Sequence, residues 1–284
     1  MVIGSGGMAG HVIYNYLSDH GYNCVGIARN PIPRQRNFLL DVSNFCELDR
    51  LIQNESPDVV INAVGILIKG SKASISNAIL MNSYFPHLLS DICKRYNSKL
   101  FHISTDCVFS GKLGGYKEDS FKDADDIYGR SKALGEVINE HDLTIRTSII
   151  GPEIKDDGDG LFHWFMNTSG VARGFNNVFW SGVTTFELAK AIEELINSDI
   201  TGLIHLTNNK KISKYELLVL LKEIWGRDDI DIIADFGPKH DKSLVSNRLP
   251  TDIRIPEYKE MLISMKNEMA NDLMYTQYRA VDNL

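Results

Sequence analysis

The chain has 284 residues, which is enough for one large domain or two modest ones with a sizeable core. Apolar residues make up 43% and charged residues 24%, as is usual for a soluble globular protein. The net charge of −7 and the lack of a bilayer-spanning apolar run argue against nucleic-acid and membrane partners. Without a basic, cleavable leader at residue 1, we expect a cytoplasmic protein.

Strands and helices are predicted to alternate through the first half of the chain. Continuous apolar runs bounded by turn residues predict the strands, and apolar residues at helical spacing predict the helices. This alternation is typical of an α/β fold, and we expect a Rossmann-type, doubly wound parallel sheet. The predicted strands are 1–3, 23–28, a strand ending at Asp41, 58–67, 99–105 and 143–150, and the helices are 9–21, 45–56, 74–96 and 126–141.

The second half is less regular. A polar, glycine-rich loop covers 151–160, and an amphipathic helix over 184–198 follows an N-cap at Thr184 or Thr185. A strand over 202–207 and a helix over 213–226 come next, and the last twenty residues are expected to be helical at the surface.

Three glycines, Gly4, Gly7 and Gly10, lie between the first predicted strand and the first predicted helix. This is the context of a dinucleotide-binding turn. The glycines would permit the tight turn, the approach of backbone N–H groups to a pyrophosphate, and close packing of helix on strand. The phosphates would then face the positive end of the helix. A plain glycine-rich turn is the alternative.

The residues after the second and third strands bear on the choice of cofactor. A site for NAD usually has an acidic residue after the second strand, whereas this chain has Arg29 there. Because an arginine can pair with a 2′-phosphate, Arg29 favours NADPH, with NADH as the alternative. A solvated Arg29 is the simpler explanation. Asp41 could accept from an adenine amino group or cap the following helix.

Tyr128 and Lys132 are four residues apart within a predicted helix and so share one face of it. A nearby ammonium is expected to lower the pKa of the phenol, which would make the pair a proton donor. Thr105 ends the preceding strand, where its hydroxyl could hold a carbonyl oxygen and orient Tyr128 or could cap the next turn. The small residues of 63–65 end another strand, where they would let a ribose come close.

These stretches resemble the extended short-chain dehydrogenase/reductases and, among them, the dTDP-4-dehydrorhamnose reductase family. The resemblance rests on GSGGMAG, LDVSN, DVVINAVG, STDCVFSGKLGGYKED, YGRSKALGE and IRTS, which occur in the family's order over the first 150 residues. It implies that Thr105, Tyr128 and Lys132 are catalytic. The cofactor-binding residues it implies, taken with those above, are Gly4, Gly7, Met8, Ala9, Gly10, Arg29, Asp41, Val42, Ala63, Val64, Gly65, Tyr128 and Lys132.

The implied reaction is NADPH-dependent reduction of the 4-keto group of a nucleotide-activated 6-deoxyhexose for cell-surface polysaccharide synthesis. The chain departs from the family's pattern at Cys107, where a tyrosine is usual, and at Ile149, where tryptophan is frequent. Two substrates therefore stay open, namely dTDP-4-dehydrorhamnose and a UDP-linked 2-acetamido-2,6-dideoxy-4-keto sugar. Candidate substrate contacts are Thr105, Asp106, Ile149, Trp164 and Trp180, with Arg173, Lys239 and Lys242 for the nucleotide diphosphate.

We expect residues 1–150 to form the dinucleotide-binding domain, to which 183–205 returns, and 151–182 with 206–284 to form a smaller α/β substrate domain. The family resemblance also makes a homodimer an expectation. A sugar-nucleotide epimerase or dehydratase is one alternative function, and a non-catalytic regulatory subunit of the same fold is another. No metal is expected, because the histidines show no paired ligand spacing.

Overall fold

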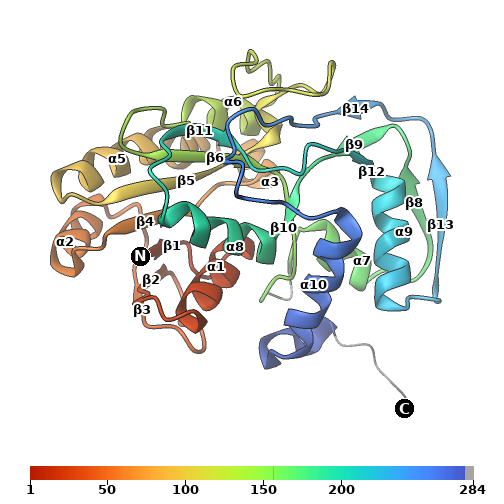
Figure 1. The fold of residues 1–284 in the computed structure, drawn as a ribbon, viewed down its shortest axis with the longest axis horizontal. Coiled ribbons are helices and arrows are strands. Elements are labelled where there is room, and N and C mark those ends of the chain that lie inside the picture. The colour runs from red at the N-terminus through yellow and green to blue at the C-terminus, as the bar shows by residue number, and fades with distance from the viewer. Residues whose placement is uncertain (156, 279–284) are drawn as a thin grey trace.

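The computed structural model describes residues 1–155 and 157–278. A seven-stranded parallel sheet forms its centre, in the order β11-β6-β5-β4-β1-β2-β3 (Figure 1). Successive strands are added in one direction from β1 to β3 and in the other from β4 onward, which makes the position beside β1 the switch point of a doubly wound Rossmann fold, so the predicted fold class is confirmed. The strands are β1 (Val2–Ile3), β2 (Gly26–Ala28), β3 (Asn37–Leu39), β4 (Val59–Asn62), β5 (Lys99–Thr105), β6 (Leu143–Thr147) and β11 (Gly202–His205).

Helices cover both faces of this sheet, because successive strand residues point to opposite sides. On one side, Val2, Ile61 and Phe101 join a core with α1 (Met8–Asp19) and α8 (Thr185–Ile196). On the other side, Ile3 and Val60 join a second core with α2 (Phe45–Glu55) and α5 (Phe85–Arg95). The helix N-cap left open between two threonines is Thr184, whose side chain accepts from Glu187 N.

Two predicted helices differ from their expected form. The segment 74–96 divides into α4 (Ile75–Ala78), a π-helical turn η1 (Ile79–Tyr84) and α5, in which Pro86 lies in the first turn. A short α3 (Ile68–Ala73) precedes it. The helix expected to reach residue 141 is α6 (Ile127–Leu134), and Gly135 caps it. A Cβ on Gly135 would lie 1.8 Å from Asn82 O, so only glycine fits at this end of the helix, where it meets η1.

The second half of the chain adds small sheets and helices beside the large sheet, and β11 returns to pair with β6. The division into two domains stays a prediction, because one apolar core includes residues from both halves. The further strands are β7 (Ile149–Ile150), β8 (Gly170–Phe175), β9 (Val178–Trp180), β10 (Val183–Thr184), β12 (Ile212–Ser213), β13 (Ile230–Asp235) and β14 (His240–Asp241). The helices are α7 (Leu161–Met166), α9 (Lys214–Trp225), α10 (Tyr258–Ala270) and the 3₁₀ helix η3 (Leu273–Tyr278).

The last twenty residues are helical and mostly exposed over their described part, as expected, but four of their side chains are buried. Met265, Met269, Tyr275 and Tyr278 are at most 4% exposed. Their apolar side chains join the core that α1 and α8 share, which the polar composition of the segment hides. Residues 279–284 lie outside the described part of the chain.

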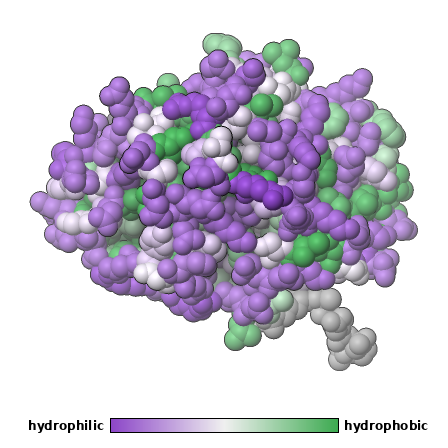
Figure 2. All heavy atoms as spheres, viewed as in Figure 1, coloured by the Kyte–Doolittle hydropathy of each residue, from purple (hydrophilic) through white to green (hydrophobic). Residues whose placement is uncertain are grey.

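Hydrophilic residues cover most of the face seen in Figure 2. Within residues 1–155 and 157–278, no helix has the length and apolar character needed to cross a membrane.

Candidate active site

The glycine turn between β1 and α1 has the geometry that a phosphate cradle needs. Gly4 has a φ of +83°, a conformation that side chains disfavour. A Cβ on Gly10 would lie 2.1 Å from Gly4 O, so only glycine lets α1 come this close to the turn. Gly7 is the exposed N-cap of α1 and offers no side chain to the free N–H groups of the first turn. These donors fit a pyrophosphate, which the helix dipole also favours.

The end of β4 lies directly beside this turn. A Cβ on Gly4 would lie 3.0 Å from Val64 Cγ2, and Ala63 N donates to Ile3 O over 3.0 Å. The structure therefore brings Ala63, Val64 and Gly4 to one edge of the sheet. Both segments carry predicted cofactor-binding residues, and their small side chains leave backbone groups accessible to a dinucleotide.

Arg29 follows β2 and is exposed. It lies near Asp41, whose pKa is lowered mainly by hydrogen bonds from Ser43 and to a smaller extent by the charge of Arg29. The two neighbouring arginines are held by carboxylates, since Arg34 pairs with Asp19 and Asp272, and Arg36 pairs with Glu55. Within the described residues Arg29 forms no salt bridge, so its guanidinium is available for a 2′-phosphate.

Asp41 does not cap α2. Asn44 is the N-cap, and its side chain accepts from Glu47 N. Val42, the next cofactor-lining candidate, packs against the core formed with α2 and α5. The carboxylate of Asp41 instead holds the turn after β3 through Ser43, and its predicted contact with the adenine stays a prediction.

Tyr128 is positioned by the first turn of α6. Asp126 caps this helix by accepting from Gly129 N over 2.9 Å. A Cβ on Gly129 would lie 2.2 Å from Cys107 O, so glycine lets α6 pack against the turn that follows β5. This packing brings the phenol of Tyr128 close to the Thr105 hydroxyl at the end of β5.

The pKa of Tyr128 is shifted in the direction opposite to our expectation. Burial raises the pKa of Tyr128, and Cys107 and Asp106 add to this, while the hydrogen-bonding hydroxyl of Thr105 opposes it. Loss of solvent thus outweighs the hydrogen bond from Thr105. The phenol is therefore protonated at neutral pH and can act as an acid.

Lys132 lies one helical turn after Tyr128 and is buried. Its Nζ donates to Ile103 O over 2.8 Å and lies 3.5 Å from His102 Nε2. Burial lowers the pKa of Lys132 to about 8, although the carboxylate of Glu136 acts in the opposite direction. The amine and the ammonium forms are therefore both accessible near neutral pH.

Thr105, Asp106 and Cys107 form the turn that faces Tyr128. Thr105 Oγ1 donates to Asp106 Oδ1 over 3.1 Å and accepts from Cys107 N over 3.1 Å. Burial raises the pKa of Asp106, whereas Lys242 and Lys214 lower it. Burial and Asp106 raise the pKa of the Cys107 thiol to about 12, so this cysteine is a neutral thiol.

The second half of the chain contributes Trp180, Lys242 and Lys214 to this turn. Lys214 Nζ lies 5.5 Å from the centre of the Trp180 ring, and the indole Nε1 donates to Ser148 Oγ over 2.8 Å. Both lysines act electrostatically on Asp106 and Cys107. Sequence reasoning missed Lys214, because in the sequence it is only the first residue of a capped helix.

The other predicted substrate contacts lie elsewhere on the surface or in the core. Trp164 is 43% exposed on α7, and Arg173 lies 3.7 Å from Asp235 on the adjacent strand β13. Lys239 is exposed, and Ile149 on β7 packs against the core next to Ser148. Roles of these four residues in substrate binding stay predictions.

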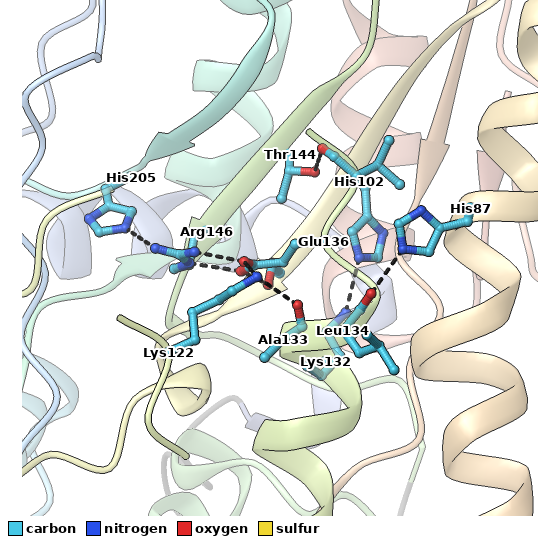
Figure 3. A network of polar contacts seen from close by, with 12 residues as sticks. His87, His102, Lys122, Lys132, Ala133, Leu134, Glu136, Thr144, Arg146 and His205 are labelled. Atoms are coloured by element: carbon cyan, nitrogen blue, oxygen red, sulfur yellow. Dashed lines mark hydrogen bonds and ion pairs between the residues drawn. The ribbon is translucent and has the colours of Figure 1, made fainter. Parts of the chain in front are cut away.

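A buried polar network lies beneath the site (Figure 3). Glu136, just after α6, accepts from Arg146 of β6 and from Ser104 of β5. Lys122 reaches the same carboxylate at 3.1 Å, and Arg146 also contacts His205 at 2.7 Å. The network joins β5, β6 and β11 to the end of α6. No group of three or more acidic, histidine or cysteine side chains suited to a metal ion occurs in the parts of the chain described above.

Comparisons with known proteins agree on one family. A family model described as "RmlD substrate binding domain" matches residues 1–280. The chain is 25% identical to the spore coat polysaccharide biosynthesis protein SpsK of Bacillus subtilis, over 78% of each chain. It is also 25% identical to the dTDP-4-dehydrorhamnose reductase of Aggregatibacter actinomycetemcomitans, over 78% of this chain and 77% of that one. The Xenopus laevis methionine adenosyltransferase 2 subunit beta is 22% identical, over 76% and 69%.

Solved structures show the same fold. A hypothetical dTDP-4-dehydrorhamnose reductase from Sulfolobus tokodaii matches with a TM-score of 0.76 and 27% identity, over 90% of this chain and 97% of that one. A dTDP-4-dehydrorhamnose reductase from Bacillus anthracis in complex with NADP matches with a TM-score of 0.81 and 19% identity, over 94% and 98%.

Proposed function

The chain belongs to the RmlD substrate binding domain family, and from this membership and the geometry of its site we propose that it reduces the 4-keto group of a nucleotide-activated 6-deoxyhexose. It is an NADP-dependent oxidoreductase of the sugar-nucleotide reductase type, with NADH as the alternative cofactor. Tyr128, Thr105 and Lys132 lie together at the end of β5, at the same edge of the sheet as the glycine turn. This placement is the observation that carries the proposal.

The roles of the residues follow from their surroundings. When bound, NADPH supplies a hydride to the carbonyl carbon. The carbonyl oxygen gains negative charge, and Tyr128 donates its phenolic proton to that oxygen. A positioned general acid contributes about 10²–10⁴-fold in rate. The protonated state of Tyr128 that burial maintains suits this role.

Thr105 and Lys132 support the proton transfer. Thr105 lies within reach of the phenol and can hold the substrate oxygen in line with it. Lys132, with a pKa lowered to about 8, can return a proton to the site after Tyr128 has given one up. Its anchorage on Ile103 O keeps Nζ close to the end of β5.

The substrate is proposed to enter between β5 and the second half of the chain. Lys214 and Lys242 offer positive charge for a diphosphate, and the buried Trp180 ring lies beneath Lys214. Both dTDP-4-dehydrorhamnose and a UDP-linked 2-acetamido-2,6-dideoxy-4-keto sugar fit this chemistry. The cytoplasmic location and the homodimer also stay predictions.

The test is oxidation of NADPH by the purified protein, followed by absorbance, with each of the two keto sugars. We expect turnover with one of them and a loss of about 10²–10⁴-fold in Tyr128→Phe, which removes only the acidic proton. The matched control is Tyr16→Phe, because Tyr16 binds Glu193 on α8, away from β5, and its loss should leave turnover unchanged. Equal turnover in wild type and Tyr128→Phe would contradict the assignment.

Two outcomes would favour the alternatives. Binding of NADPH without turnover of either sugar would favour a regulatory subunit, a possibility supported by the similarity to methionine adenosyltransferase 2 subunit beta. A product with inverted stereochemistry and no net oxidation of NADPH would favour an epimerase.

A further inference from the structure

A buried chain of hydrogen-bonding groups leads from the end of β4 to Lys132. We propose that His102 is a positioning residue whose Nε2–H group, oriented by Asn62, sets the protonation state of Lys132. The inference rests on the proposed function for its catalytic meaning, but its geometry is independent of the sugar that is reduced. His102 and Asn62 are both fully buried and lie side by side on the paired strands β5 and β4.

The orientation of the Asn62 amide is determined by the backbone. Val64 N donates to Asn62 Oδ1 over 3.1 Å, so the amide oxygen must face Val64. The amide nitrogen then faces His102, where Asn62 Nδ2 lies 3.1 Å from His102 Nδ1. The opposite orientation would bring two N–H donors together at Val64. Asn62 is therefore the donor to Nδ1.

This contact selects one form of the imidazole. Because Nδ1 accepts a hydrogen bond, a neutral His102 carries its proton on Nε2. Burial holds the pKa of His102 well below its usual value, and the charge of Lys132 lowers it further, so the ring is neutral at neutral pH. The Nε2–H group points toward Lys132 Nζ, 3.5 Å away (Figure 3).

The Nε2–H group favours a neutral amine at Lys132. An ammonium has only donors to offer, whereas an amine has a lone pair that can accept from Nε2–H. The groups that act on Lys132 are His102 and the Ile103 carbonyl from β5, with Glu136 from just after its own helix. His87 of α5 acts on His102 and contacts Leu134 O over 2.9 Å. Glu136 favours the ammonium, whereas burial and the Nε2–H group of His102 favour the amine.

Histidine-labelled protein gives the direct test by nuclear magnetic resonance, without any substrate. The nitrogen chemical shifts of His102, assigned with His102→Gln, should report the Nε2–H form throughout the neutral pH range. An Nδ1–H form or a charged ring at neutral pH would overturn the proposal. The pKa of Lys132, followed on labelled lysine, should be near 8 in the wild type.

Asn62→Asp is the informative variant. A carboxylate at this position accepts from Nδ1–H, so the proton moves from Nε2 to Nδ1 and the Nε2 lone pair faces Lys132. We expect the pKa of Lys132 to rise by about 1 or more, and the pH profile of kcat to move upward with it. Asn62→Leu, which is close to asparagine in size, removes the donor without adding charge. It should give a smaller rise in the pKa of Lys132.

Asn44→Asp is the matched control, because it makes the same chemical change at the exposed N-cap of α2, where aspartate is equally suitable. It should leave both the form of His102 and the pKa of Lys132 unchanged. A changed His102 form in the Asn62 variants with an unchanged pKa of Lys132 would refute the inference. Absence of sugar turnover in the wild type, with these spectra as expected, would instead count against the proposed function.

Discussion

Arg146 and Glu136 form a two-pronged ion pair that is almost completely removed from solvent. Arg146 Nε donates to Glu136 Oε1 over 2.8 Å, and a terminal guanidinium nitrogen donates to Oε2 over 2.7 Å. The two side chains are 1% and 0% exposed. Because hydrogen bonds from Arg146, followed by the charges of Arg146 and Lys122, oppose burial, the pKa of Glu136 is lowered and the carboxylate stays ionised.

Removal of one member of this pair is expected to destabilise the fold strongly. Arg146→Met leaves Glu136 buried without its main partner, and breaking a buried pair typically costs about 3–5 kcal/mol. Urea unfolding would measure the decrease in the free energy of unfolding. The matched control is Arg95→Met, because Arg95 pairs with Asp49 at the surface, where about 1 kcal/mol or less is expected. Equal losses of unfolding free energy in the two variants would show that the buried Arg146 pair contributes no more to stability than the surface pair.

Arg29→Ala tests the cofactor preference. If Arg29 binds the 2′-phosphate, the variant should lose about 10- to 100-fold in affinity for NADPH, and its affinity for NADH should hardly change. Titration of both cofactors by fluorescence would measure this. Arg36→Ala is the control from the same loop, because Arg36 is held by Glu55. An equal loss of affinity for NADH would place Arg29 outside the 2′-phosphate site.

Lys242→Met tests the anionic part of the substrate site. Lys242 lies beside Asp106 and Cys107, so we expect its loss to raise KM for the sugar nucleotide by about 10- to 100-fold, with a smaller effect on kcat. Steady-state kinetics would separate the two constants. Lys94→Met, in the exposed last turn of α5, should leave KM unchanged. A purely structural Lys242 would lower the melting temperature and leave KM of the folded enzyme as it was.

His11 should make the protein sensitive to acid. Burial lowers the pKa of His11 from 6.5 to about 4, although its contact with Gly7 O opposes this. Between these pH values the unfolded chain binds a proton that the folded chain does not, so stability falls as pH decreases from 6.5 to about 4. The full effect is up to roughly 3 kcal/mol.

His11→Asn keeps a donor for Gly7 O and removes the titrating ring, so the free energy of unfolding should vary less over this range. Urea unfolding at several pH values would measure it. His20→Asn is the control, since His20 makes the same contact with Tyr16 O in the same helix but is exposed. If His11→Asn and the wild type lose stability equally on acidification, another group is responsible.

Local sequence patterns predicted the elements that line the proposed cofactor site, but not all of the residues around the proposed substrate site. Gly4, Gly10 and Gly129 are each required by a close backbone approach, so their places in the sequence carry structural information. Lys214 carries none, because a lysine after an N-cap is usual at any surface helix. Trp164 was a reasonable candidate by type, yet it is 43% exposed on α7.

The length of α6 is a second feature that local sequence patterns did not predict correctly. Helical spacing continued past Gly135 in the sequence, but α6 ends at Leu134, and Gly135 packs against the backbone of Asn82 in η1 so closely that only glycine fits. Glu136, the next residue, turns inward to Arg146. Both contacts join Gly135 and Glu136 to other elements, so helical spacing alone could not show them.

The sequence by itself determined the order of strands and helices, the glycine turn and the shared helix face of Tyr128 and Lys132. Periodicity, turn residues and close-packing glycines act over a few residues, so they can be read locally. The tertiary structure alone decided that Tyr128 remains a protonated phenol, that Lys132 lies against His102, and that Lys214 joins Asp106. These properties depend on burial and on charges from distant segments, and neither is encoded at any single position.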